Sequence, residues 1–134
     1  MSYTVEESIT LLKETFKQFK FEFGSIEFGG TIPFFLIFSE NEKKLEEKWD
    51  EIADFIAVDF QSRQTDEFQV WNIYVFYITE SPIKKELKYK IENDTFSSRK
   101  IIIDDTKDID LIIRENIINS LSIGSSKKEN SNNK

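Results

Sequence analysis

The chain has 134 residues, of which 25 are acidic and 18 are basic, and its formal net charge is −7. It contains no histidine and no cysteine, which excludes disulfides, thiol nucleophiles, histidine general bases and the usual zinc sites. Thirteen phenylalanines, two tryptophans and four tyrosines are enough to build one aromatic core in a chain of this length.

The charge is distributed unevenly along the chain. The last ten residues carry three lysines and one glutamate, so residues 1–124 have a net charge of −9. We expect residues 1–124 to form a single domain and residues 125–134 a disordered polar tail. An acidic body does not favour broad DNA binding, which needs a basic face. The acidic N-terminus and the short apolar runs predict a cytoplasmic protein without membrane contact.

The first half of the chain predicts a helix, three strands and a second helix. Apolar residues at helical spacing in residues 4–20, behind a Thr4–Glu7 capping box, predict the first helix. Alternation through residues 21–28 is interrupted by Gly24-Ser25, which predicts a hairpin turn at that dipeptide. Pro33 precedes FFLIF, a run typical of a strand buried on both faces. Residues 41–61 return to helical spacing and predict the clearest helix.

The second half predicts a central strand, a short helix, a last strand and a last helix. The stretch FQVWNIYVFYIT is β-branched and aromatic throughout, so we expect it at the centre of the sheet. Ser81 and Pro82 suit an N-cap and a first turn, and the apolar spacing behind them predicts a helix that ends near Asn93. Residues 97–104 predict the last strand, and Asp108 opens the last helix.

These elements follow the order α-β-β-β-α-β-α-β-α. The predicted fold class is therefore α+β, with a mixed sheet of about five strands covered by amphipathic helices.

Two patterns that imitate ligand-binding motifs have simpler interpretations. The stretch GSIEFGGT has the spacing of a phosphate-binding loop, but a glycine occupies the place of the lysine that such a loop needs. Four aspartates between residues 104 and 110 could bind a hard cation, yet they lie where helix capping already favours acids. We therefore expect neither a nucleotide site nor a metal site there.

The stretch KYKIENDTFSSRKIII, residues 88–103, predicts a helix end, a turn and a strand. Asparagine, aspartate and threonine in its middle suit the turn, and Glu92 and Asp94 can pair with Arg99 and Lys100 across it. Asn72, which interrupts the apolar run before this stretch, needs a hydrogen-bond partner. It either lies on an exposed face or at a bulge, or it bonds to the 88–100 segment.

Residues 81–100 form a basic stretch within an acidic body, with six cations against three acids. Two interpretations are open: a solvated helix face, or a surface that docks to an acidic partner or touches DNA phosphates. The candidate contact residues are Lys84, Lys85, Lys88, Lys90, Arg99 and Lys100.

Taken together, WNIYVFYI and KYKIENDTFSSRKIII resemble the middle component of bacterial ABC-three-component defence systems, the group that includes Lamassu-type antiphage operons. The resemblance covers residues 68–104. Its motif positions are Trp71, Asn72, Tyr74, Tyr89, Ile91, Glu92, Asp94, Phe96, Arg99 and Lys100. The resemblance implies a non-catalytic adaptor between an SMC-like or ABC-type ATPase that senses invading DNA and an effector, commonly a nuclease. It implies no cofactor and no small-molecule substrate, and the acidic body assigns DNA contact mainly to the ATPase.

Two other functions are open from the residues alone. An acidic immunity or antitoxin protein would block a basic toxin through the carboxylates of Glu42, Glu46, Glu47, Asp50 and Asp54. A metal-dependent nuclease would use Glu92 and Asp94 as ligands beside Lys100. Nuclease sites of that type place a Glu-x-Lys triplet on a strand, and no predicted strand of this chain carries one.

Overall fold

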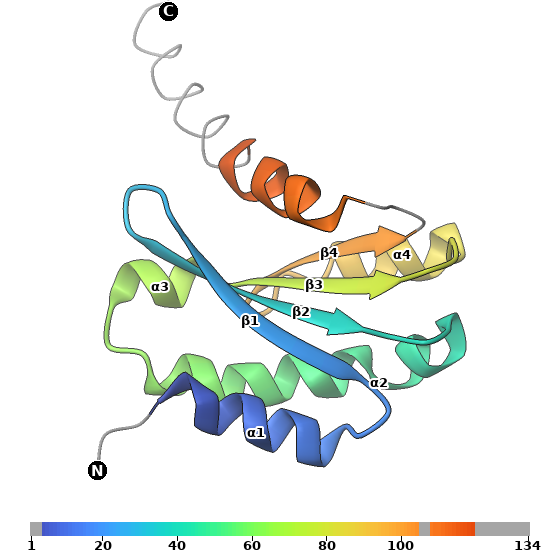
Figure 1. The fold of residues 1–134 in the computed structure, drawn as a ribbon, viewed down its shortest axis with the longest axis horizontal. Helices are drawn as coiled ribbons and strands as arrows, with labels where there is room; N and C mark the ends of the chain where they lie inside the picture. The colour runs from blue at the N-terminus through green and yellow to red at the C-terminus, as the bar shows by residue number, and fades with distance from the viewer. Residues whose placement is uncertain (1–3, 105–107, 120–134) are drawn as a thin grey trace, which may run out of the picture.

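The computed structural model describes residues 4–104 and 108–119, and within them a four-stranded mixed sheet forms the centre of the molecule (Figure 1). The strands are β1 (Lys20–Glu27), β2 (Thr31–Phe38), β3 (Tyr74–Thr79) and β4 (Arg99–Asp104), in the spatial order β1-β2-β3-β4. β1 is antiparallel to β2, and β2, β3 and β4 are parallel. Every residue of β3 is buried, which confirms the prediction of a central strand.

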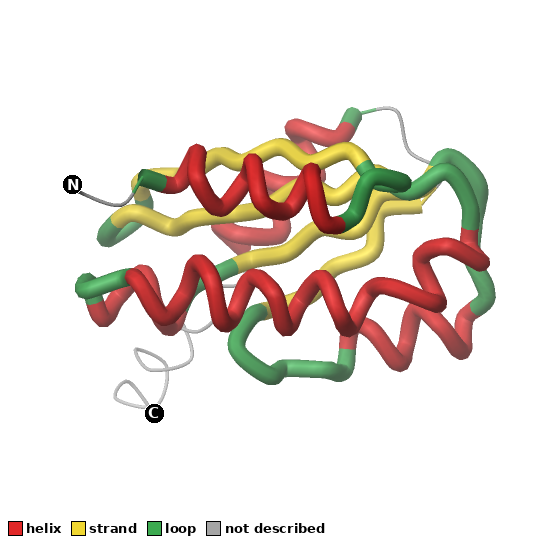
Figure 2. The backbone as a smooth tube through the Cα atoms, turned by 90° about the horizontal axis from the view of Figure 1, so that it is seen from below, coloured by secondary structure: helices red, strands yellow, loops and turns green. Residues whose placement is uncertain are grey.

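Helices cover both faces of this sheet. One face packs against α1 (Val5–Thr15), α2 (Glu42–Phe55) and α4 (Lys85–Glu92), whereas the other packs against a helix over residues 109–119. Figure 1 shows α1 and α2 on one side of the sheet and the 109–119 helix on the opposite side. Figure 2 shows α1 and α2 lying side by side beneath the strands. The α+β fold class is confirmed, with a sheet sandwiched between helices.

The two core clusters follow from the alternation of side chains along the strands. On β3, Val75 and Tyr77 belong to the cluster under α1, α2 and α4, whereas Tyr74, Phe76 and Ile78 belong to the cluster under the 109–119 helix. The buried hydroxyl of Tyr77 donates a hydrogen bond to the Trp49 carbonyl at 2.9 Å, which ties the central strand to α2. Burial raises the pKa of Tyr77 well above its usual value, so this hydroxyl stays a donor.

Capping residues place the starts of the first two helices. The Glu7 carboxylate accepts a hydrogen bond from the Thr4 backbone N–H at 3.1 Å, and the predicted capping box is present. The Asn41 side chain accepts from the Lys44 N–H at 2.9 Å. Both starts are confirmed. α1 ends at Thr15, earlier than predicted, and α2 continues as a π-helical turn, Ile56–Phe60, and a 3-10 turn, Gln61–Arg63.

The predicted hairpin turn at Gly24-Ser25 is wrong, because β1 runs straight through this dipeptide. Gly24 pairs with Phe34, and a Cβ on Gly24 would approach the Phe34 ring to 2.4 Å. The glycine therefore serves a close approach within the sheet. The turn lies instead at residues 28–30, where Gly29 has a φ of +78°. Two predicted strands are thus one, and the sheet that the described residues form has four strands rather than about five.

The predicted strand through Trp71 and Asn72 also begins later than expected. Residues 67–71 form a short helix, α3 (Glu67–Trp71), and β3 starts at Tyr74. Asp66 caps α3 by accepting from the Phe68 N–H at 3.0 Å. The aromatic run looks like one strand in the sequence, but this cap and the packing of Phe68 over Gly30 turn its first part into a helix.

The start predicted for α4 at Ser81 and Pro82 is wrong as well. α4 begins at Lys85, and carboxylates from other elements hold the segment before it. Asp104 accepts from the Ile83 N–H at 3.0 Å, and Glu42 accepts from the Lys84 N–H at 2.7 Å. These tertiary bonds hold the segment before α4, and Lys84 has an extended backbone. The predicted end near Asn93 is confirmed, since Asn93 is the C-cap.

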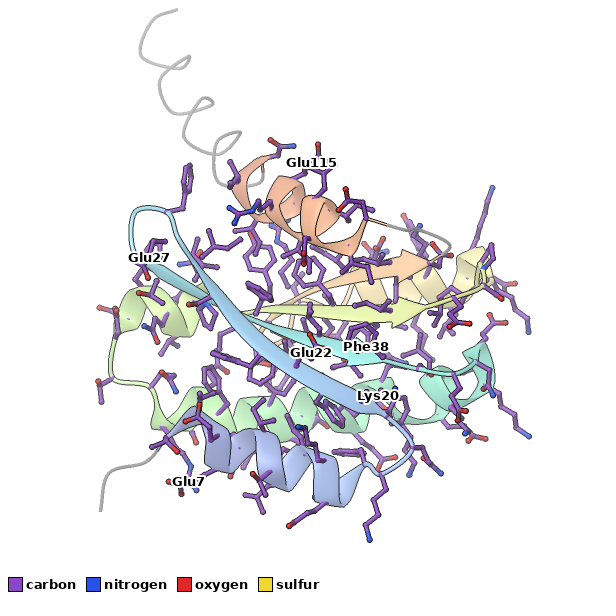
Figure 3. All side chains as sticks on the ribbon, in the orientation of Figure 1. Glu7, Lys20, Glu22, Glu27, Phe38 and Glu115 are labelled. Atoms are coloured by element: carbon purple, nitrogen blue, oxygen red, sulfur yellow. The ribbon has the colours of Figure 1, made fainter. Side chains whose placement is uncertain are left out.

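The last helix begins where it was predicted. The Asp108 side chain accepts from the Leu111 N–H at 3.1 Å, and Ile113 and Ile117 are buried against the sheet. Glu115 lies on the outer side of this helix (Figure 3). Asp105, Leu121 and the predicted tail over 125–134 lie outside the described residues. No helix within 4–104 or 108–119 is long and apolar enough to cross a membrane.

Candidate functional site

The two halves of the sequence motif meet at the N-terminal ends of β3 and β4. Arg99 is the register partner of Tyr74, and its N–H donates to the Ile73 carbonyl at 2.9 Å. Residues 70–74, Thr95 and residues 97–99 line a pocket of about 270 Å³, which we call the turn pocket. It lies at the amino ends of the strands, opposite to the carboxyl ends where open parallel sheets usually bind small ligands.

Gln61 bridges the two halves of the pocket. Its side-chain amide donates to the Val70 carbonyl at 2.8 Å and to the Ser97 carbonyl at 3.0 Å. The 3-10 turn that follows α2 thus holds the end of α3 against the turn before β4. Sequence reasoning missed Gln61, because a glutamine in a polar loop gives no signal that its amide reaches two distant carbonyls.

Lys100 holds the turn from inside the protein. It is 2% exposed, and its ammonium group donates to the carbonyls of Phe96 at 2.8 Å, Asp94 at 3.2 Å and Ser98 at 3.2 Å. It also donates to the Asp94 carboxylate at 3.3 Å, which confirms the predicted pairing across the turn. Burial lowers the pKa of Lys100, and the Asp94 carboxylate acts in the opposite direction.

Ser97 adopts a strained backbone at the tip of this turn. Its φ is +64°, and a hydrogen bond from the Ser98 N–H to the Phe96 carbonyl at 2.8 Å closes a three-residue γ-turn around it. The hydroxyl oxygens of Ser97 and Ser98 are both buried, and neither has a partner within 4–104 or 108–119. Strain and unpaired buried hydroxyls in one turn are typical of functional sites.

Glu92 protects the edge of the sheet rather than pairing with a cation. Its carboxylate accepts from the Ile102 N–H at 2.8 Å, so it caps a backbone donor on the edge strand β4. The predicted pairing of Glu92 with Arg99 or Lys100 is therefore replaced by this bond. β1 forms the other edge and carries the charged side chains of Lys20, Glu22 and Glu27 (Figure 3). The charges on β1 and the cap on β4 disfavour pairing of either edge with an added strand.

Three further motif residues point inward. The Asn72 side chain donates to the Phe68 carbonyl at 2.7 Å and caps the end of α3, so neither prediction for its partner is correct. Tyr74 is buried and stacks with Phe76 at a ring distance of 6.2 Å. Ile91 is fully buried in the larger core cluster. Their roles are structural, and they fix the backbone around the turn pocket.

Three other motif residues point outward. Trp71 is 77% exposed, Tyr89 is 74% exposed and Phe96 is 66% exposed. Trp71 lines the turn pocket, Phe96 lies between two pocket-lining residues, and Tyr89 lies on α4. Large aromatic side chains left in water forgo the free energy that burial would supply, and such residues dominate many protein interfaces. We call these three residues the aromatic trio.

The predicted basic contact residues divide into accessible and inaccessible groups. Lys84, Lys85, Lys90 and Arg99 are exposed, and the Arg99 guanidinium lies 6.0 Å from the centre of the Tyr74 ring. Lys88 is half-buried and pairs with Asp104 at 3.6 Å. Lys100 is buried and its ammonium group donates hydrogen bonds to the turn. The prediction of Lys100 as a contact residue is therefore wrong.

Glu92 and Asp94, which a metal-dependent nuclease would use as ligands, do not form a metal site in the described structure. Glu92 is bonded to a backbone N–H, and the Asp94 carboxylate accepts from the Phe96 N–H at 2.9 Å as well as from Lys100. In the part of the chain that the structure describes, no three acidic side chains form a group that could hold a metal ion.

A larger hollow lies at the opposite end of the sheet. It has a volume of about 620 Å³ and is lined by residues 17–20, 38–40 and 78–80 at the carboxyl ends of β2 and β3. Glu40 on its rim pairs with Lys44 at 2.5 Å, and that ammonium group lowers the pKa of the Glu40 carboxyl. None of the residues predicted from the sequence lines this hollow.

Comparison with known proteins gives a family match. Residues 33–125 match the family model described as ABC-three component (ABC-3C) system Middle Component 1. The matched range begins within β2 and contains α2, α3, β3, α4 and β4, together with both halves of the turn pocket. No curated protein and no solved structure gave a significant match.

Proposed function

The chain belongs to the Middle Component 1 family of ABC-three-component systems, and we propose that it is a non-catalytic adaptor subunit of an antiphage defence complex. In this proposal it links an SMC-like or ABC-type ATPase, which senses invading DNA, to an effector nuclease, as in Lamassu-type systems. The family describes a component of a multi-subunit system, and the adaptor role, the ATPase and the nuclease are our proposals.

The aromatic trio is the observation that carries this proposal. Trp71, Tyr89 and Phe96 are each at least 66% exposed, although the same short segments bury Tyr74, Ile91 and Lys100. Exposed aromatics beside a rigid, hydrogen-bonded turn fit a protein interface, where aromatic anchors supply most of the binding free energy. The surface we propose for docking follows α4 and the turn after it. It runs from Lys84 and Lys85, near the carboxyl end of β4, through Tyr89 and Lys90, to Phe96, Arg99 and Trp71 at the amino end of that strand. We call it the docking face.

The charge of the docking face indicates the kind of partner. Residues 1–124 have a net charge of −9, so a polyanion such as DNA is repelled by most of the molecule. The local cations suit an acidic protein surface, where complementary charges speed association and select the partner. We therefore assign DNA contact to the ATPase and protein contact to this chain.

The test begins with purification of the chain from its own operon, expressed together with its neighbouring genes. The proposal predicts that an ATPase with coiled-coil arms and an effector stay bound in moderate salt. Replacement of Lys84 and Lys85 by glutamate should lower the affinity for the partner by about tenfold. Both positions open α4, where acids are favourable to the helix dipole, but a glutamate at 84 also lies beside the Glu42 carboxylate. Thermal unfolding of the variant therefore checks that the fold is intact. Lys88 is left unchanged because its reversal would oppose Asp104.

The acidic immunity or antitoxin function has its own observation and its own control. Glu46, Glu47, Asp50 and Asp54 are all exposed along α2, so a basic toxin would find an acidic helix face. Replacement of Glu46 and Asp50 by lysine should leave binding unchanged if the chain is an adaptor. If this change alone abolishes association, or if one small basic protein is recovered, the adaptor proposal is wrong and the toxin-blocking function replaces it.

A further inference from the structure

The turn pocket has a composition that is unusual for this chain. Among the described residues, nine line it and none of these is acidic, although the chain has 25 acids against 18 bases. The lining contains hydrogen-bond donors of three kinds: the Arg99 guanidinium, the Trp71 indole and the Thr95 hydroxyl. An acid-free pocket with one cation and several donors suits an anionic acceptor group.

The turn beneath the pocket adds an independent observation. The hydroxyl oxygens of Ser97 and Ser98 are buried at the pocket wall and have no partner among the described residues. Ser97 is held at a φ of +64° by bonds from Gln61 and Lys100 to the carbonyls around it. The turn is strained and held by bonds from other elements, so it gives the pocket a wall of fixed shape.

Trp71 defines the apolar side of the same pocket. It is 77% exposed and ends α3, whose last turn Asn72 and Gln61 hold in place. A tryptophan on a braced helix end offers a flat apolar surface at low entropic cost, and tryptophan and arginine are the residues most enriched at interface hot spots. The pocket therefore combines an apolar platform with a cation beside it.

We infer that the turn pocket receives a carboxylate side chain, aspartate or glutamate, from a segment of the adjoining subunit, with the apolar part of that segment lying on Trp71. This inference rests on the adaptor role proposed above and names the chemistry of the contact. Arg99 pairs with the carboxylate, and the hydroxyl of the exposed Thr95 supplies a further donor. A nucleic acid is the less suitable occupant, because a single cation in a body of −9 offers too few phosphate contacts.

The first experiment measures the affinity of the purified subunit for its partner subcomplex, with matched variants. Trp71→Ala should weaken binding by about 30-fold, the loss typical of an interface hot spot. Val58→Ala is the control, because Val58 is 74% exposed and does not line the turn pocket. Arg99→Gln should weaken binding and reduce its salt dependence, whereas Arg99→Lys should keep most of both. Thermal unfolding of each variant checks that the fold is intact.

The second experiment identifies the occupant directly. A photo-cross-linking phenylalanine analogue replaces Trp71 in the assembled complex, and the same analogue at Val58 is the control. We expect a cross-link from position 71 to a partner peptide that contains aspartate or glutamate, and none from position 58. A cross-link to DNA, or to a peptide without acids, overturns the inference.

The outcomes separate the two proposals. If the wild-type chain retains no partner, the adaptor role fails and the pocket inference fails with it. If the wild-type chain retains its partner but Trp71→Ala and Arg99→Gln bind as well as Val58→Ala, the adaptor role stands and the carboxylate pocket is wrong.

Discussion

The motif residues divide by the direction in which their side chains point. Asn72, Glu92 and Asp94 each accept or donate a short hydrogen bond within the chain, and Lys100 is surrounded by carbonyls. Trp71, Tyr89 and Phe96 point into solvent. Asn72 fixes the end of α3, Glu92 holds β4, and Asp94 and Lys100 fix the turn between α4 and β4. The outward side chains are then presented by a rigid backbone. Preorganised side chains lose less entropy when they bind, so the inward residues serve recognition indirectly.

Lys100 is the residue on which the turn depends most. Lys100→Met keeps the side-chain length but leaves the carbonyls of Asp94, Phe96 and Ser98 without their donor in a buried place. We expect the free energy of unfolding in denaturant to fall by about 3 kcal/mol. The matched control is Lys90→Met, an exposed position where a change within about 0.5 kcal/mol is expected. A loss below about 1 kcal/mol at Lys100 would show that its ammonium group does not support the turn.

At the scale of elements, the sequence predicted what local chemistry determines and missed what tertiary contacts determine. α1 and α2 were predictable because apolar stripes and caps at Thr4 and Asn41 are local signals. The strand through Gly24 was misread as a turn, because the packing of the Phe34 ring against the glycine involves a residue ten positions away. α4 starts late because the Asp104 and Glu42 carboxylates, which lie on other elements, accept hydrogen bonds from the backbone just before it.

The corrected hairpin gives a prediction of its own. Ser25→Val places a β-branched residue at an exposed position in the middle of β1, so the free energy of unfolding should change by less than about 0.5 kcal/mol. Gly29→Val forces a β-branched residue to a φ of +78° and should cost about 1–2 kcal/mol. Chemical denaturation of the two variants measures both values. The reverse order of costs would return the turn to Gly24-Ser25.

The candidate site was partly visible in the sequence for the same reason. The pairing of Asp94 with Lys100 was predicted from their spacing, and the basic stretch was visible as a run of charges. The burial of Lys100 was not visible, because an arginine followed by a lysine looks like two exposed cations in the sequence. Successive side chains of a strand point to opposite faces, so Arg99 is exposed and Lys100 is buried. The bridge made by Gln61 spans 36 residues to Ser97, and no local pattern encodes it.

At the scale of the whole molecule, the charge and the aromatic surface are segregated. α2 presents exposed carboxylates, whereas α4 and the turn pocket present exposed cations and the aromatic trio. One edge strand is charged and the other is capped by Glu92, so neither edge favours pairing with a partner strand. Binding through the docking face is thus the arrangement that the surface of this molecule supports, consistent with a component of a multi-subunit system.

The most direct test of this account is amide hydrogen exchange of the chain alone and in the complex purified from its operon. We expect the partner to slow exchange in residues 67–73 and 84–99, which contain the docking face, and to leave the outer face of α2 unchanged. Slower exchange confined to residues 42–55, with no change in residues 84–99, would contradict the account and place the interface on the acidic helix.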